Sequence, residues 1–220
     1  MNAPKARPEP KPRPASKPWY RSRGWWLKQF HNWHWMSAAV SLIGMLLFAA
    51  TGFTLNHAAT ISASPTTSTL SGQLPAPLLS SLARPARADA PLPARVASFI
   101  DDRLNLDPSG KPAEWSDGEV YVALPRPGGD AWVSIDTTTG AISGELTDRG
   151  WISWANDLHK GRNAGGVWSW FIDIFAIACV LFTLTGLMLL YMHAKPRRST
   201  WPLVGLGLIA PLLIILFFVH

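Results

Sequence analysis

The sequence lacks the residues from which disulfide frameworks and nucleotide-binding loops are built. Cys179 is its only cysteine, so the chain can form no intramolecular disulfide. No glycine-rich G-x-G-x-x-G stretch follows a predicted strand, as a dinucleotide-binding fold requires. Charged residues are also absent between Met36 and Leu55. The chain therefore offers neither a disulfide scaffold nor a nucleotide site, and one long segment is apolar enough to lie in a membrane.

Acidic residues are scarce at the start of the chain. Residues 1–30 contain eight Lys or Arg and one acidic residue, Glu9, a balance of +7. Because the whole chain carries +6, the remainder is slightly acidic, which argues against a nucleic-acid-binding domain. Lys195, Arg197 and Arg198 form a second basic group. Basic residues beside spanning helices mark the cytoplasmic side, so we expect the N-terminus inside and the C-terminus outside.

Three apolar runs are long enough to cross a bilayer as helices, at residues 35–55, 167–192 and 201–219. A helix rises ~1.5 Å per residue, so about 20 residues span the hydrocarbon core. Tryptophans gather at the start of the first two runs, as in the aromatic belts of membrane proteins. They are Trp19, Trp25, Trp26, Trp33 and Trp35, and Trp151, Trp154, Trp168 and Trp170. The predicted fold is a mainly α membrane protein with three transmembrane helices.

The segment between the first two spans contains a small predicted α+β module. PARVASFIDDRLNLD has apolar residues at helical spacing, GEVYVALP alternates like a strand, and AWVSIDTTTGAISGEL predicts a hairpin that turns around residues 137–140. The module contains no histidine, no cysteine and no catalytic constellation. The predicted organisation is a disordered basic tail (1–18), an interfacial helix with the first span (19–57), a linker (58–92), the module (93–149), an interfacial re-entry segment (150–166), and the second (167–193) and third (201–219) spans.

All six histidines lie at the ends of apolar segments. His31 and His34 precede the first span and His57 follows it, while His159 precedes the second span and His193 follows it. If these helices run antiparallel, the histidines meet in pairs at the two membrane faces. A single interfacial histidine is explained by its tolerance of the headgroup zone, but the joint pattern predicts a metal site, most simply haem. Imidazoles from facing helices can hold one macrocycle at both axial positions, which suits electron transfer.

Several alternatives remain open within this pattern. His34 and His57 differ by roughly 140° around a helix, whereas His31 and His57 differ by roughly 80°, so either His31 or His34 is the inner ligand. The outer pair of His57 and His159 is also open to zinc or copper, although two histidines are too few ligands for zinc. A Thr-Gly pair precedes His57 and His193, in TGFTLNH and TGLMLLYMH, and opens space beside each for a ring. Asp173, inside the second span, is either functional or paired with Lys160 or Arg162.

Two long stretches resemble the PepSY-associated transmembrane helix proteins of bacterial inner membranes. They are NWHWMSAAVSLIGMLLFAATGFTLNH and LHKGRNAGGVWSWFIDIFAIACVLFTLTGLMLL. The outer module, with its closing VSIDTTTGAI hairpin, looks like a PepSY-type domain. Some members of the wider family are di-haem ferric-siderophore reductases with bis-histidine ligation. The resemblance therefore implies two haems b, with axial ligands at His57, His159, His193 and either His34 or His31.

The resemblance implies an inner-membrane haem protein that carries electrons across the bilayer to a periplasmic acceptor such as a ferric chelate. Its partners would be membrane lipid, an electron donor on the cytoplasmic side and the periplasmic acceptor. This chain has three spans and no flavin- or nucleotide-binding segment, so we expect it to need a separate donor, and a second copy of the chain is a further expected partner. The alternative is a non-catalytic module that binds a periplasmic protein or peptide, with the spans as its anchor.

Overall fold

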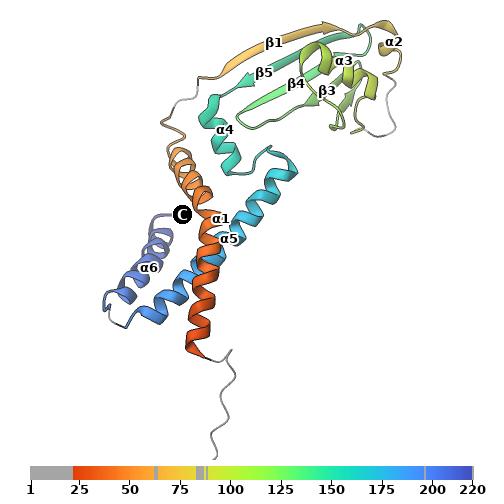
Figure 1. Ribbon diagram of the computed structural model, residues 1–220. Helices are drawn as coiled ribbons and strands as arrows, with labels where there is room; N and C mark the ends of the chain where they lie inside the picture. The colour runs from red at the N-terminus through yellow and green to blue at the C-terminus, as the bar shows by residue number, and fades with distance from the viewer. Residues whose placement is uncertain (1–21, 62–63, 83–86, 88, 196, 220) are drawn as a thin grey trace, which may run out of the picture. The chain divides into compact units, whose positions relative to one another are not determined.

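The computed structural model describes residues 22–61, 64–82, 87, 89–195 and 197–219. Three helices are long and apolar enough to cross a membrane: α1 (Arg23–Asn56), α5 (Gly165–His193) and α6 (Thr200–Phe218) (Figure 1). This confirms the prediction of three transmembrane helices with a small α+β module between the first and the second. The predicted disordered tail, residues 1–18, lies outside the described residues, as does His220.

The described residues form two compact units. The first contains the part of α1 up to Ser41, the part of α5 from Ile177 onward, and α6. The second runs from Leu42 to Ala176 and contains the rest of α1, the soluble module, α4 (Gly150–His159) and the start of α5. Each candidate histidine contact discussed below falls inside one of these units.

Small side chains let α1 and α5 approach each other within each unit. In the first unit, Ser37 and Ser41 of α1 and Ala178 of α5 are buried. Both serine hydroxyls donate to carbonyl oxygens of their own helix, so burial leaves neither unsatisfied. In the second unit, Gly44 lies against the Phe175 ring, where a Cβ atom would overlap the ring carbons. Ser37, Ser41 and Gly44 of α1 therefore serve helix packing.

The module is built on a five-stranded antiparallel sheet with strand order β1-β5-β4-β3-β2. Its strands are β1 (Thr66–Gln73), β2 (Glu114–Ser116), β3 (Glu119–Ala123), β4 (Gly129–Asp136) and β5 (Ala141–Asp148). β4 and β5 form the predicted hairpin, with Ile135 opposite Ile142. Its turn is fixed by the Asp136 carboxylate, which accepts the Thr138 hydroxyl (2.6 Å) and the backbone N–H groups of Thr138 and Thr139 (2.8 Å each).

One helix covers this sheet and completes its core. α3 (Ala94–Leu104) buries Val96, Ala97 and Ile100, on the apolar face that the sequence predicts. These side chains pack with the inward-facing residues of the sheet, among them Val120, Val122, Val133, Ile135 and Ile142. The alternating burial along β4 leaves the other face of that strand half-buried. The module therefore has a core of its own.

The predicted linker, residues 58–92, contains regular structure. β1 occupies Thr66–Gln73 and pairs along its whole length with β5, and α2 covers Ala76–Leu79. The sequence does not predict β1, because TTSTLSGQ has a single large apolar residue, Leu70. Its pairing with β5, rather than an apolar face of its own, holds it in the sheet.

Candidate functional site

His34 packs against a Thr-Gly pair of α5. Its Nδ1 atom lies 3.1 Å from the Thr185 hydroxyl oxygen and 3.1 Å from the Phe182 carbonyl oxygen. Its ring stacks on Phe182 at a centroid distance of 4.5 Å. A Cβ atom on Gly186 would lie 3.1 Å from the His34 ring carbon Cε1, so glycine provides the room for the imidazole. α5 thus presents a polar acceptor and an open space to one histidine of α1.

His159 uses the corresponding Thr-Gly pair of α1. Its Nδ1 atom lies 2.6 Å from the Thr51 hydroxyl oxygen. A Cβ atom on Gly52 would lie 3.5 Å from the His159 ring carbon, and the ring also packs on Phe48 at a centroid distance of 4.9 Å. The sequence suggests that each Thr-Gly pair makes room for a ring beside the histidine that follows it. In the structure each pair receives the imidazole of a histidine from another helix.

His31 and His193 are brought together at the ends of α1 and α5. Their ring centroids are 6.0 Å apart and their planes are nearly perpendicular, at 87°. Each Nδ1 atom contacts the carbonyl oxygen four residues earlier in its own helix, Leu27 at 2.9 Å and Leu189 at 2.8 Å. The structure therefore places His31, rather than His34, beside His193, as helical phase favours.

His57 and His159 are not in contact in the described part of the chain. The Nδ1 atom of His57 lies 3.0 Å from the Phe53 carbonyl oxygen, and its ring packs on the Phe53 side chain with centroids 4.4 Å apart. His159 packs instead against Thr51, as described above. The outer pair expected from the sequence is thus two separate histidines in this structure.

Four of the five described histidines share one hydrogen-bonding arrangement. A carbonyl oxygen only accepts hydrogen bonds, so the Nδ1 atoms of His31, His34, His57 and His193 must carry the proton. In the neutral imidazole of these four residues the lone pair is then on Nε2. Metal-ligating histidines are oriented in this way, with the second nitrogen fixed by an outer hydrogen bond. His159 contacts instead the Thr51 hydroxyl at 2.6 Å, and a hydroxyl can donate or accept.

A bare metal ion and haem need different numbers of protein ligands. Among the described residues, no three His, Cys, Asp or Glu side chains cluster as ligands. A structural zinc site needs four protein ligands. Haem needs at most two from the protein, because the macrocycle supplies the others. The His31–His193 pair offers two imidazoles from two helices, which is the number of ligands that haem takes from a protein.

Helix α4 links His159 to the soluble module. The buried Asp157 carboxylate accepts the backbone N–H of Gly128, in the turn between β3 and β4, at 2.9 Å. Gly128 has φ +72°, and a Cβ atom there would lie 2.7 Å from the Trp154 Cα atom. On the α1 side, the Thr54 hydroxyl donates to the Asn156 side-chain oxygen at 2.7 Å. Neighbouring residues of α4 thus contact the β3–β4 turn and α1.

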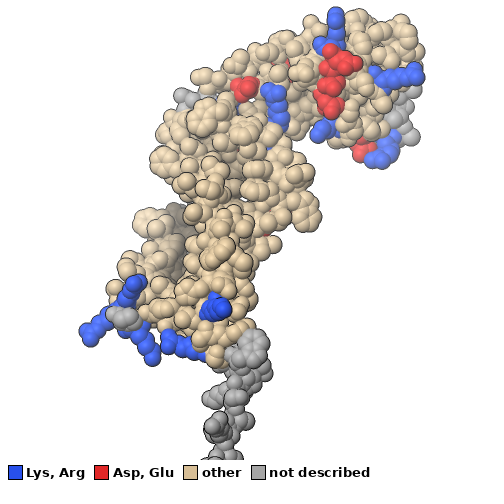
Figure 2. Space-filling model, viewed as in Figure 1, with Lys and Arg blue, Asp and Glu red and all other residues tan. Residues whose placement is uncertain are grey.

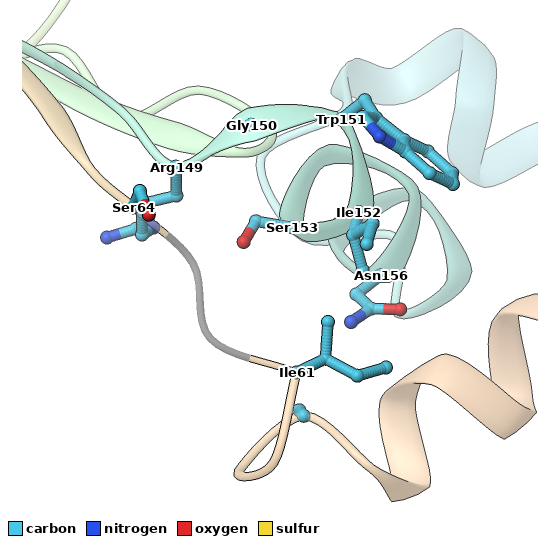
Figure 3. Close-up of a pocket in the computed structure, with 9 residues that line it drawn as sticks. Ile61, Ser64, Arg149, Gly150, Trp151, Ile152, Ser153 and Asn156 are labelled. Atoms are coloured by element: carbon cyan, nitrogen blue, oxygen red, sulfur yellow. The ribbon is translucent and has the colours of Figure 1, made fainter.

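Two cavities of about 260 Å³ flank α4. One is apolar and is bordered by His159, Phe48, Trp168 and Phe171. The other lies between α4 and the segment after α1, with Asn156, Ser153 and Arg149 on its α4 side (Figure 3). Figure 3 shows Asn156 directed towards Ile61 across the second cavity. Both cavities are below the ~300–1,000 Å³ typical of small-molecule sites, so neither by itself makes a cofactor pocket.

Asp173 is exposed on α5. Lys160 forms its ion pair with Asp157, at 3.5 Å, and not with Asp173. Arg162 also forms no ion pair with Asp173 in the described part of the chain. The interfacial pairing considered for this acid is therefore not formed here.

A model of the PepSY_TM-like family matches residues 25–220 of the chain. The chain belongs to the PepSY_TM-like family. A search of curated proteins found no significant match, and neither did a search of solved structures. The family match begins two residues into α1 of this PepSY_TM-like protein and covers the rest of that helix, the module, α5, α6 and all five described histidines. It establishes a membrane protein of this family, and the activity is argued below from the residues.

Sequence reasoning did not find the partners of the histidines in this PepSY_TM-like protein. The sequence shows Thr51 and Thr185 as parts of two Thr-Gly pairs. The histidine ring beside each pair comes from a different helix, so the sequence does not identify it. Asp157 and Asn156 had no motif to mark them, although both are buried. Their burial distinguishes these two polar side chains, and burial is known only once the fold is known.

Proposed function

We propose that this chain is a b-type haem protein of the bacterial inner membrane that passes electrons across the bilayer. The observation that carries the proposal is the His31–His193 pair, two imidazoles from two spanning helices with ring centroids 6.0 Å apart. Both keep the proton on Nδ1 by bonding to their own helix, which leaves Nε2 as the ligand atom. Haem held by these two histidines would supply one-electron transfer.

The chain's own residues have defined tasks in this proposal. His31 and His193 would hold the group between α1 and α5, and the Leu27 and Leu189 carbonyl oxygens orient the two rings. The sequence also predicts a second haem held by His57 and His159, but these two histidines are separate in this structure, so the proposal rests on the His31–His193 pair. Electrons would enter from a cytoplasmic donor and leave to a periplasmic acceptor such as a ferric chelate, with the N-terminus inside and the C-terminus outside.

Histidine variants of the purified full chain test the proposal. His31→Ala and His193→Ala should each remove the same haem, measured as haem per chain and as the reduced-minus-oxidised spectrum. His34→Ala is the matched control, because His34 lies one turn from His31 but bonds to Thr185. Loss of haem from the His34 variant alone would assign the ligand to His34 and refute the pair. His57→Ala and His159→Ala test the second haem by the same measurement.

A second candidate function rests on the free edge of β1. This strand pairs with β5 on one side, and it forms the end of the described sheet. Seven of its eight residues are polar or glycine, and most are exposed. An open edge of this kind accepts an extended peptide by strand addition. The module would then bind a periplasmic protein or peptide, with the spans as its anchor.

Hydrogen exchange tests this second function. Unstructured peptides added to the full chain should slow amide exchange in β1 and leave the β3–β4 turn unchanged. Exchange in β1 that stays the same at saturating peptide would contradict it.

A further inference from the structure

A basic cavity lies where α5 ends and α6 begins. It has a volume of about 540 Å³ and is confined to the first unit. This is within the ~300–1,000 Å³ of small-molecule sites. Its charged and aromatic lining residues are Arg23, Lys195, Arg197, Arg198, Tyr191 and Trp201. Figure 2 shows the Lys and Arg side chains gathered where α1 begins and α5 meets α6.

No acidic residue balances these cations. The described residues of the first unit, 22–41, 177–195 and 197–219, contain no Asp or Glu. Four basic side chains around one cavity repel one another unless an anion lies between them. The positive charge of the cavity therefore favours an anionic ligand.

Two further features of the cavity favour an anion. Arg23 donates to the Met192 carbonyl oxygen at 2.8 Å, which holds its guanidinium at the end of α5. α6 begins at Thr200, beside the cavity, and has no acidic residue in its first turn. The positive dipole end of such a helix attracts negative charge. Arginine side chains and a helix N-terminus are a common combination at phosphate sites.

The aromatic wall of the cavity points to an amphiphilic ligand. The rings of Tyr191 and Trp201 are in contact, with centroids 6.1 Å apart. Both residues belong to spanning helices, α5 and α6. Tyr and Trp at the ends of spanning helices lie at the level of lipid headgroups. A ligand of this cavity would thus have its charge near the arginines and its apolar part along the helices.

We propose that this cavity binds the phosphate headgroup of an anionic phospholipid. Lys195, Arg197, Arg198 and Arg23 surround the phosphate, and the Tyr191–Trp201 pair borders the glycerol and the first part of the acyl chains. A free phosphate compound has the same anionic group but lacks the acyl chains. The two sources are therefore distinguished by whether binding requires the lipid tails.

The test uses the full chain in nanodiscs of neutral phosphatidylcholine, with and without phosphatidylglycerol. Retained lipid is counted by native mass spectrometry, and the affinity is measured by titrating phosphatidylglycerol into the detergent-solubilised chain. Arg197→Gln and Arg198→Gln should each weaken binding about fivefold, as expected for one basic residue near an anionic headgroup. Lys28→Gln is the matched control, because Lys28 is a cation of the same unit that does not line the cavity. It should bind like the wild type.

Three results would overturn the proposal. The first is equal retention of phosphatidylcholine and phosphatidylglycerol by the wild-type chain. The second is equal loss of affinity in Lys28→Gln and Arg197→Gln, which would show a general surface charge effect. The third is saturation by glycerol 3-phosphate alone at the concentration that phosphatidylglycerol needs, which would assign the cavity to a soluble phosphate.

Discussion

Replacing Gly128 by alanine is expected to loosen the contact between the β3–β4 turn and α4. Gly128 is buried, has φ +72°, and donates its N–H to Asp157. An alanine in this left-handed region costs about 1–2 kcal/mol. Its Cβ atom would also lie 2.7 Å from the Trp154 Cα atom, so backbone must move. Overpacking of this kind typically adds about 1–3 kcal/mol.

Gly118→Ala is the matched control for this prediction. Gly118 also has a positive φ, +87°, and lies in the turn between β2 and β3, but nothing lies within 4 Å of the position of its Cβ atom. Gly118→Ala should therefore lose only the free energy that a positive φ costs an alanine. The difference between the two variants, about 1–3 kcal/mol, corresponds to about a 5- to 150-fold change in an opening equilibrium.

Hydrogen exchange of the full chain in detergent measures this difference. Amides of α4 should exchange about 5- to 150-fold faster in Gly128→Ala than in Gly118→Ala. The Thr51 contact of His159 depends on the placement of α4, so the faster exchange should extend to the end of that helix. Equal exchange of α4 in the two variants would show that the turn does not hold α4, and would refute the reasoning.

Three further predictions concern the spanning helices and the hairpin turn. Thr185→Val removes a hydroxyl acceptor of His34 and should destabilise the contact between α1 and α5 by about 1 kcal/mol. The melting temperature in detergent should therefore fall, whereas Thr183→Val, at an exposed position, should leave it unchanged. Gly44→Ala places a Cβ atom on the Phe175 ring and should lower the melting temperature more than Gly205→Ala, where the space is open. Hydrogen bonds from the Thr138 hydroxyl and the backbone N–H groups of Thr139 and Thr138 lower the pKa of Asp136 to about 2. The ionised Asp136 carboxylate should therefore stabilise the fold fully above the unfolded pKa near 3.8, and this stabilisation should be lost as the pH falls through about 2. An Asp136→Asn chain that loses stability over this pH range as steeply as the wild type would contradict the assignment.

The spanning helices could be predicted from the sequence because their signal is local. An uncharged run of about 20 apolar residues has few alternatives to a membrane helix. The apolar spacing of α3 and the TTTG turn of the β4–β5 hairpin are equally local, and the structure has both. β1 was not predictable, because its place in the sheet depends on β5, whose residues 141–148 lie far along the chain.

The histidine contacts show the same limit. Helical phase relates residues of one helix. Because His31 lies closer in angle to His57 than His34 does, it favoured His31 as the inner ligand, and His31 is the residue found beside His193. The contacts of His34 with Thr185 and of His159 with Thr51 join different helices, and no periodicity within one helix encodes them. The Thr-Gly pairs were visible in the sequence, but the side chain that each receives became clear only in the fold.

The haem content of the purified full chain tests the central claim most directly. The account predicts a reduced-minus-oxidised spectrum of haem b after expression with sufficient haem, with haem quantified per chain. It also predicts that His31→Ala and His193→Ala lose the same spectral component while His34→Ala keeps it. A folded chain that remains colourless after haem reconstitution, or that keeps its full spectrum in both the His31 and His193 variants, would contradict the account.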